Sequence, residues 1–245
     1  MSAPVFLAEG RVLHAGDTVV LDGAEGHHAA TVQRLRVGER VVLTDGRGAS
    51  GNGGVLSVDR DRLEVLLSDV ATHPDPQPRL TVVQALAKGD RGELAVSTMT
   101  EVGVDRVVPW AASRCVVRWE AARGQRALAK WRSTGREAAK QSRRAWFPEV
   151  TDLANTADVV DRLRCAAVAV VLHEEATEPV AALDLPSAGE VVVVVGPEGG
   201  ISPEELAAFE DAGARACRLG PTVLRTSTAG PVALGVLLAK TARWS

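Results

Sequence analysis

The chain has 245 residues, of which 46% are hydrophobic and 24% charged, with a formal net charge of −3. This length suits one large or two modest globular domains, and no apolar run approaches the roughly 20 residues of a membrane span. The first 14 residues lack a basic region followed by an apolar one, so we expect no secretory signal. Cys115, Cys165 and Cys217 are far apart and form no C-x-x-C pair. They predict reduced cysteines of a cytoplasmic protein, without disulfides or a metal site.

Short β-rich runs separated by Gly, Asn and Asp turns fill the first 72 residues, at 17–21, 39–46, 54–58 and 62–67. One short helix over about 27–36 interrupts them, and the pattern predicts a small β-barrel. Gly46 to Gly51 matches the dinucleotide pattern G-x-G-x-x-G. Because another turn and another strand follow, where that pattern needs a helix, we interpret it as a hairpin loop.

The stretch "THPDPQP" has prolines at alternate positions, which suit neither a helix nor a ladder. It predicts a linker at 73–79 between a domain at 1–72 and a second domain at 80–245. In the second domain, strands are predicted at 79–86, 105–110, 166–173, 190–196 and 214–220. Helices are predicted at 92–103, 120–143, 202–213 and 226–243. Apolar strands that alternate with helices predict an α/β fold with a parallel sheet covered on both faces.

Positive charge is concentrated in residues 114–144, which hold ten Lys or Arg against two acidic residues. This segment is +8, so the rest of the chain is −11. A cationic segment on an acidic protein is typical of a face that binds a polyanion; the alternative is a solvated helix face.

The stretch "VVVVVGPEGGISPEEL", residues 191–206, joins a buried strand to a helix through a glycine-rich loop. Ser202, Pro203 and Glu205 form a capping-box pattern at the start of that helix. The loop has no G-K-[ST], and Glu198 would repel a phosphate. The pattern therefore favours a neutral or cationic ligand held by peptide groups, or else a structural turn.

A second loop, in "RLGPTVLRTSTAGPVALGVLLA", ends with the polar run Arg225, Thr226, Ser227 and Thr228 at the start of an apolar helix. Arg225 precedes the positive end of that helix, where a cation is unfavourable unless an anion compensates it, which favours a functional role. Loops at the carboxyl ends of adjacent parallel strands converge on one crevice. We therefore expect the loops near His173, Gly200 and Thr228 to share a pocket, with His173 either a base or a structural residue.

The chain resembles a known family along most of its length. The motifs that carry the resemblance are "VGPEGGIS", "LGPTVLRTSTA", "QALAKGDRGE", "EVGVDRVVPW", "SRCVVRW", "EAAKQSRR" and "HHAATVQRLRVGERVVLTDGRG". They are similar to the 16S ribosomal RNA (uracil-N3) methyltransferases of the SPOUT superfamily. This chain has Ser227 where the family commonly has Glu, so any role of that Glu carboxylate is not carried over. It also has Arg143 where Gly is usual.

The resemblance implies a PUA-like barrel, an α/β domain with a C-terminal trefoil knot, a homodimer, and S-adenosylmethionine bound in the knot. The expected cofactor contacts are Leu172, His173, Gly196, Glu198, Gly199, Gly200, Leu219, Gly220, Leu224 and Thr226. Arg225 is expected to stabilise the uracil anion, with Thr226 and Thr228 bonding to the base or cofactor. The expected RNA contacts are Arg34, Arg36, Lys88, Arg91, Arg118, Arg136, Lys140, Arg143 and Arg144.

The implied substrate is small-subunit 16S ribosomal RNA, with no metal and no membrane. Because N3 lies on the Watson–Crick edge, the target base must be unpaired or flipped. Two alternatives stay open, since a fold does not fix a function. One is another SPOUT methylation, at a ribose 2′-oxygen or another base position. The other is a non-catalytic RNA-binding or assembly factor.

Overall fold

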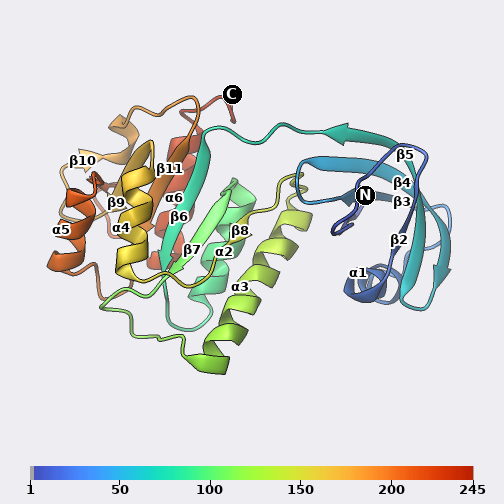
Figure 1. The fold of residues 1–245 in the computed structure, drawn as a ribbon, viewed down its shortest axis with the longest axis horizontal. Coiled ribbons are helices and arrows are strands. Elements are labelled where there is room, and N and C mark those ends of the chain that lie inside the picture. The colour runs from blue at the N-terminus through green and yellow to red at the C-terminus, as the bar shows by residue number, and fades with distance from the viewer. Residues whose placement is uncertain (1–2, 245) are drawn as a thin grey trace. The chain divides into compact units, whose positions relative to one another are not determined.

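The structure is a computed structural model that describes residues 3–244. The chain forms two compact units, the first made of Met1–Asp75 and Ala139–Phe147 and the second of Pro76–Ala138 and Pro148–Ser245. Figure 1 labels their helices and strands. No helix within residues 3–244 is both long enough and apolar enough to cross a membrane.

The first unit contains a five-stranded sheet in the order β1-β3-β4-β5-β2. Its strands are β1 (Val5–Leu7), β2 (Thr18–Leu21), β3 (Arg40–Thr44), β4 (Ala49–Asp59) and β5 (Arg62–Thr72). Leucines, valines and Phe6 from these strands form its buried core. The β-rich interpretation of this region is therefore confirmed at the level of the sheet.

The short helix of this unit begins and ends four residues earlier than the sequence predicts. It consists of α1 (Gly23–His27) and a π-helical turn over His28–Val32. Arg34 has a φ of 56°, outside the helical region, so the chain turns away there. The glycine pattern at Gly46 lies in the turn between β3 and β4, which confirms the hairpin interpretation.

Residues 139–147 belong to the first unit and are fastened to it at several points. The Lys140 Nζ atom lies 2.7 Å from the Glu25 carboxylate, and only 6% of the Lys140 side chain is exposed. The Trp146 indole N–H donates to the His73 carbonyl at 3.0 Å. Lys140 is therefore a buried structural partner of Glu25, and its expected contact with RNA stays a prediction.

The second unit is built on a seven-stranded sheet in the order β10-β12-β9-β11-β6-β7-β8, and every pair of neighbours is parallel. Its strands are β6 (Arg79–Ala85), β7 (Arg106–Trp110), β8 (Glu149–Val150), β9 (Val168–Leu172), β10 (Glu178–Pro179), β11 (Glu190–Val195) and β12 (Arg215–Arg218). The run of five valines forms the buried part of β11, which is the central strand of the sheet. This confirms the predicted parallel sheet.

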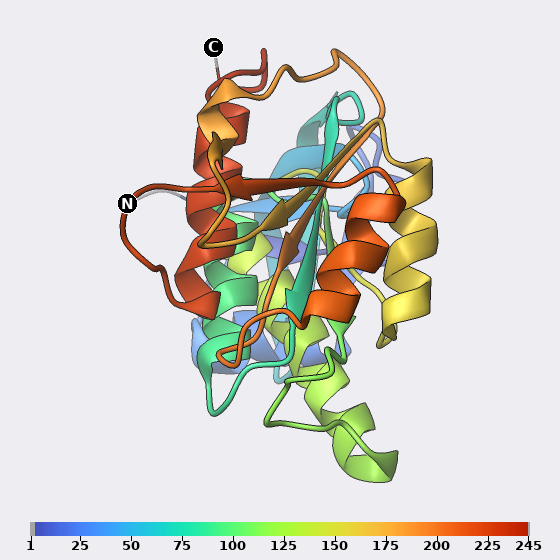
Figure 2. The same cartoon turned by 90° about the vertical axis from the view of Figure 1, so that its left-hand side faces the viewer.

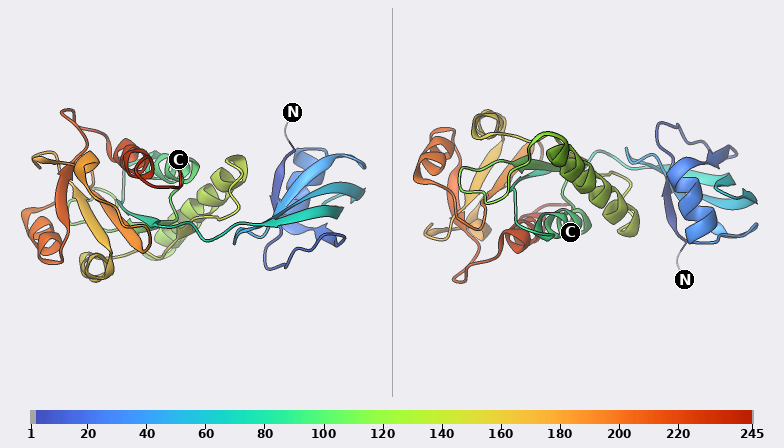
Figure 3. Two further views of the ribbon diagram at one scale, coloured as in Figure 1. Left: turned by 90° about the horizontal axis from the view of Figure 1, so that it is seen from above. Right: turned by 90° about the horizontal axis from the view of Figure 1, so that it is seen from below.

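Helices cover both faces of this sheet. Side chains of α2 (Arg91–Val102), α3 (Ala121–Gln141) and α6 (Thr226–Leu238) pack in one core cluster. Those of α4 (Thr156–Cys165) and α5 (Pro203–Asp211) pack in another cluster. Figures 2 and 3 show α6 on one side of the strands and α4 and α5 on the other. We did not predict α4, β8, β10 or the 3-10 turn at Val180–Ala182.

Glu190 lies at the end of the sheet where β6 and β11 begin. It accepts hydrogen bonds from Arg106 at 2.9 Å, from Arg162 at 3.1 Å and from the Thr81 hydroxyl. These contacts tie α4 to three strands of the sheet. Although desolvation raises the pKa of Glu190, the Thr81 hydroxyl and the two arginines bring it below its ordinary value.

Candidate functional site

The loops after β9, β11 and β12 line one cavity of about 850 Å³ at the carboxyl ends of the strands. Its wall is made mainly by residues 172–175, 195–201 and 217–226. This is the convergence expected of a parallel sheet, and it includes Leu172, His173, Gly196, Glu198, Gly199, Gly200, Leu219, Gly220 and Leu224. All the expected cofactor contacts therefore line this one cavity.

The glycine-rich loop after β11 is held in a compact turn. Gly200 has a φ of 74°, and its N–H donates to the Pro197 carbonyl at 2.9 Å. A side chain at Gly199 would place its Cβ 3.0 Å from the Arg114 carbonyl oxygen. The predicted capping box is present: Ser202 and Glu205 each accept the other's backbone N–H at 3.2 Å. The loop therefore ends at a fixed helix start.

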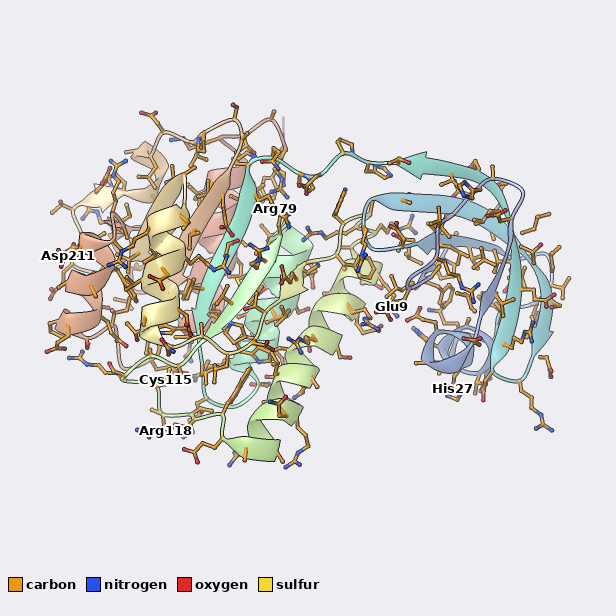
Figure 4. All side chains as sticks on the ribbon, viewed as in Figure 1. Glu9, His27, Arg79, Cys115, Arg118 and Asp211 are labelled. Carbon is orange, nitrogen blue, oxygen red and sulfur yellow. The ribbon has the colours of Figure 1, made fainter. Side chains whose placement is uncertain are left out.

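Glu205 also fixes the loop that joins β7 to α3. Its carboxylate accepts the Ser113 N–H at 2.8 Å and the Ser113 hydroxyl at 2.9 Å, and the side chain is only 6% exposed. The next residue, Arg114, lines the cavity. We did not predict Arg114 as a site residue, although its position just beyond the carboxyl end of a strand was a usable signal. Figure 4 shows Cys115 and Arg118 farther along the same loop.

Thr226 connects three segments of the site. Its hydroxyl donates to the Gly196 carbonyl at 2.8 Å and accepts a hydrogen bond from Gln84 Nε2 at 2.9 Å. Gln84 lies near the end of β6 and is fully buried, and its Nε2 also donates to the Ala85 carbonyl. The single hydroxyl proton of Thr226 is thus donated to the Gly196 carbonyl and is not free for a ligand. Gln84 is a second residue that we missed.

Arg225 and Thr228 differ in their relation to the cavity. Arg225 lines the cavity, is exposed, and occupies the cap position of α6 in an extended conformation. Thr228 is exposed and lies outside the set of residues that line the cavity. Its backbone N–H donates to the Arg225 carbonyl at 2.8 Å.

Glu198 makes an ion pair at the rim of the cavity. Its carboxylate lies 3.0 Å from the Arg91 guanidinium and accepts the Lys88 N–H at 3.2 Å. Although desolvation raises the pKa of Glu198, its own and the Lys88 backbone N–H groups, together with Arg91, lower it below the ordinary value. Glu198 is therefore an anion at neutral pH.

His173 takes part in a local turn. Its backbone N–H donates to the Cys217 carbonyl at 2.9 Å, and its Nδ1 atom accepts the Glu175 N–H at 3.3 Å. This arrangement favours the structural interpretation of His173.

The expected RNA contacts occur in both units. Arg34 and Arg36 are exposed in the first unit, where Arg143 also donates to the Ala3 carbonyl at 3.0 Å. In the second unit the structure places Lys88 and Arg91 beside the start of α2, Arg118 before α3, and Arg136 on α3. Arg144 follows α3 and is half-buried.

The wall of the cavity combines three chemical features. Leucines and peptide groups supply apolar and hydrogen-bonding surface, while Glu174, Glu175 and Glu198 supply negative charge. Arginines 91, 114, 218 and 225 supply positive charge. Among residues 3–244, no three His, Cys, Asp or Glu side chains are grouped as a metal site. The cavity therefore suits an organic ligand that carries both signs of charge.

Comparisons with known proteins agree with this architecture. A family model described as an RNA methyltransferase domain matches residues 73–238, and one described as an RNA methyltransferase PUA domain matches residues 21–68. A relative from Mycobacterium tuberculosis, named Ribosomal RNA small subunit methyltransferase E, is 48% identical over 94% of this chain and 89% of its own length. A relative of the same name from Bacillus subtilis is 28% identical, over 90% and 89% of the two chains.

Two solved structures are similar over nearly their whole length. A Neisseria gonorrhoeae ribosomal RNA small subunit methyltransferase E bound to S-adenosyl methionine has a TM-score of 0.88 and 26% identity, over 97% of this chain and 98% of that one. A Legionella pneumophila protein in complex with the cofactor SAM has the same TM-score and identity, over 98% and 99% of the two chains. The fold is thus that of RNA methyltransferases.

The chain belongs to the RNA methyltransferase family whose members carry the name Ribosomal RNA small subunit methyltransferase E.

Proposed function

We propose that this protein transfers a methyl group from S-adenosylmethionine to small-subunit ribosomal RNA. The observation that carries this proposal is the single cavity formed by the loops after β9, β11 and β12, in a chain whose relatives are named for that reaction. Solved neighbours bound to S-adenosylmethionine support the choice of cofactor.

The residues of the cavity fit this cofactor. Leu172, Leu219 and Leu224 supply apolar wall for adenine, and the glycine-rich loop presents peptide groups at close range. Carboxylates and guanidinium groups around the same wall suit a zwitterionic amino-acid tail. When bound, S-adenosylmethionine supplies a methyl group already activated by its sulfonium, so the protein needs mainly to orient it and exclude water. The anionic Glu198 at the rim is compatible with a ligand that carries no phosphate.

We further propose that the modified atom is uracil N3. This nitrogen bears a weakly acidic proton and becomes a nucleophile only when that proton is removed or the resulting anion is stabilised. Arg225 is exposed in the cavity wall and provides the cation for that anion. Thr226 acts as a positioning residue, because its hydroxyl is bonded to Gly196 and Gln84. Thr228 is available to the RNA outside the cavity wall.

The first unit, with Arg34 and Arg36, is proposed to bind RNA as a closed PUA-like barrel over residues 1–72. Residues 73–79 then form the linker to a methyltransferase domain at 80–245. The exposed arginines of residues 114–144 extend the RNA-binding surface, and cytoplasmic ribosomal subunits are the proposed place of action. The matched PUA model and the five-stranded sheet support this assignment.

We also infer a trefoil knot and a homodimer. After β12, which pairs with the outer side of β9, the chain returns to form α6, whose side chains pack with those of β6 and β11. That return across two strands supports a knot. Val223 in the loop before α6 is 75% exposed, and Val232 on α6 is 38% exposed, which supports burial by a second copy.

The experiment is mass spectrometry of 16S ribosomal RNA from cells that lack this protein and from cells in which it is restored. Loss and recovery of one N3-methyluridine is the expected result. Loss of a ribose methylation or of a different base methylation would instead support another SPOUT activity. An unchanged modification pattern, combined with no calorimetric binding of S-adenosylmethionine, would support a non-catalytic assembly factor and contradict the proposal.

A further inference from the structure

A second, smaller cavity of about 210 Å³ lies in the second unit, beside the first turn of α2 and the first half of α3. Trp119, Trp131, Gly92, Glu93 and Arg123 are among the residues that line it. Its volume is below the range of drug-sized ligand sites, so it suits a single small ring system. Apart from Arg123, one of the exposed arginines of residues 114–144, none of these residues has a role in the proposed function.

Two tryptophans give this cavity aromatic walls. The rings of Trp119 and Trp131 lie 5.0 Å apart between centroids at an interplanar angle of 82°. A Cβ at Gly92 would lie 2.5 Å from the Trp131 ring, and a Cβ at Gly124 would lie 2.8 Å from the Trp119 backbone. Glycine at both positions thus lets the segments that carry the two tryptophans pack closely. Aromatic faces of this kind stack with nucleobases.

Glu93 contributes a hydrogen-bond acceptor whose bonding is incomplete. Its Oε1 atom pairs with Lys130 Nζ at 2.9 Å. Its Oε2 atom is buried and has no hydrogen-bond partner among the described residues. Buried carboxylate oxygens are nearly always paired, so this atom favours a ligand that brings an N–H donor.

Residues in the first turn of α2 line both cavities. Arg91 lines the larger cavity and pairs with Glu198 there, while Gly92 and Glu93, the next two residues, line the smaller one. This shared turn is the reason for assigning both cavities to one strand of RNA. Arg123 in the wall and Arg118, labelled in Figure 4 on the loop before α3, supply positive charge for the backbone phosphates.

We propose that the smaller cavity binds an unpaired nucleobase with an exocyclic amino group, from a nucleotide that flanks the modified one. The base stacks on the Trp119 ring, and its amino group donates to Glu93 Oε2. Adenine, cytosine and guanine carry such a group and uracil does not. This inference rests on the proposed function, because it takes ribosomal RNA as the substrate.

The test is a tryptophan-fluorescence titration of the full chain with the single-stranded oligoribonucleotides UUUUU, UUCUU and UUAUU. A single cytosine or adenine is expected to tighten binding by about fivefold or more over UUUUU. In Glu93→Gln, the amide places an N–H₂ where the acceptor was, so this preference should be lost or reversed. Trp119→Leu should weaken binding of all three by about tenfold, whereas Trp244→Leu, which removes an exposed indole near the C-terminus, should not.

Equal affinity of the wild type for the three oligonucleotides, or a preference that survives Glu93→Gln, would overturn this inference. Calorimetry with S-adenosylmethionine and the methylation assay, run on the same preparations, separate it from the proposed function. If the wild type binds the cofactor and methylates RNA without the base preference, only the second site is wrong. If the wild type shows neither cofactor binding nor methylation, the proposed function fails whatever the oligonucleotides do.

Discussion

Thr226→Val tests the hydrogen bonds that hold the candidate site together. Valine keeps the shape of threonine and removes its hydroxyl, so the Gly196 carbonyl loses a donor at 2.8 Å and Gln84 Nε2 loses an acceptor at 2.9 Å. Gln84 Nε2 retains its bond to the Ala85 carbonyl, so the Gly196 carbonyl is the main group left unpaired. At about 1–3 kcal/mol for an unpaired group, and with Gly196 only half-buried in the cavity wall, the free energy of unfolding should fall by about 1–2 kcal/mol.

The same substitution should also weaken cofactor binding, because the Thr226 hydroxyl holds Gly196 in place and Gly196 lines the cavity. We expect an affinity loss of about tenfold, or ~1.4 kcal/mol, by calorimetry with S-adenosylmethionine. Urea unfolding gives the stability difference.

Two matched variants make this prediction specific. Thr226→Ser keeps the hydroxyl and should lose no more than about 1 kcal/mol, from the missing methyl group. Thr228→Val makes the same chemical change at an exposed position two residues away and should stay within about 0.5 kcal/mol of the wild type. If Thr226→Val proves as stable as Thr228→Val, the Thr226 hydroxyl does not hold the loops of the site together.

Arg225→Ala should lower the rate of methyl transfer by about 10²–10³-fold and leave cofactor affinity within about threefold; unchanged turnover would rule out its electrostatic role. Glu190→Gln should cost about 1–3 kcal/mol near neutral pH. Since Glu190 has a lowered pKa, its stabilisation is present above about pH 4.5 and is lost as the pH falls, so the variant should show a flatter acid-unfolding profile. Arg118→Glu combined with Arg136→Glu should reduce the slope of log binding constant against log salt concentration by about two units. An unaltered slope would show that these two arginines are solvated and do not contact RNA.

The parts of this fold that the sequence predicted depend on local patterns. The valine run of β11, the capping box of Ser202 and Glu205, and the strand after the Gly46 turn are each specified within a few residues. The shared cavity was also predictable, because parallel strands bring their carboxyl ends to one edge. Helix α4 was missed although Asn155 and Asp158 form a capping box at its start.

The parts that sequence reasoning missed depend on partners far away in the chain. Lys140 looks like one more cation of a basic helix, yet its partner Glu25 is 115 residues away. Thr226 bonds to Gln84 across 142 residues, so its positioning role is invisible in the local motif. Sequence patterns identify which residue types are present, whereas burial and pairing of this kind follow only from tertiary structure.

We propose that the loops after β9, β11 and β12 hold the methyl donor, and a crystal of this protein soaked with S-adenosylmethionine shows whether they do. Electron density for the donor is expected in the cavity, in contact with residues 196–201 and 219–224, with the methyl group facing Arg225. Clear density for the donor at any other place on the protein would rule out this cofactor site.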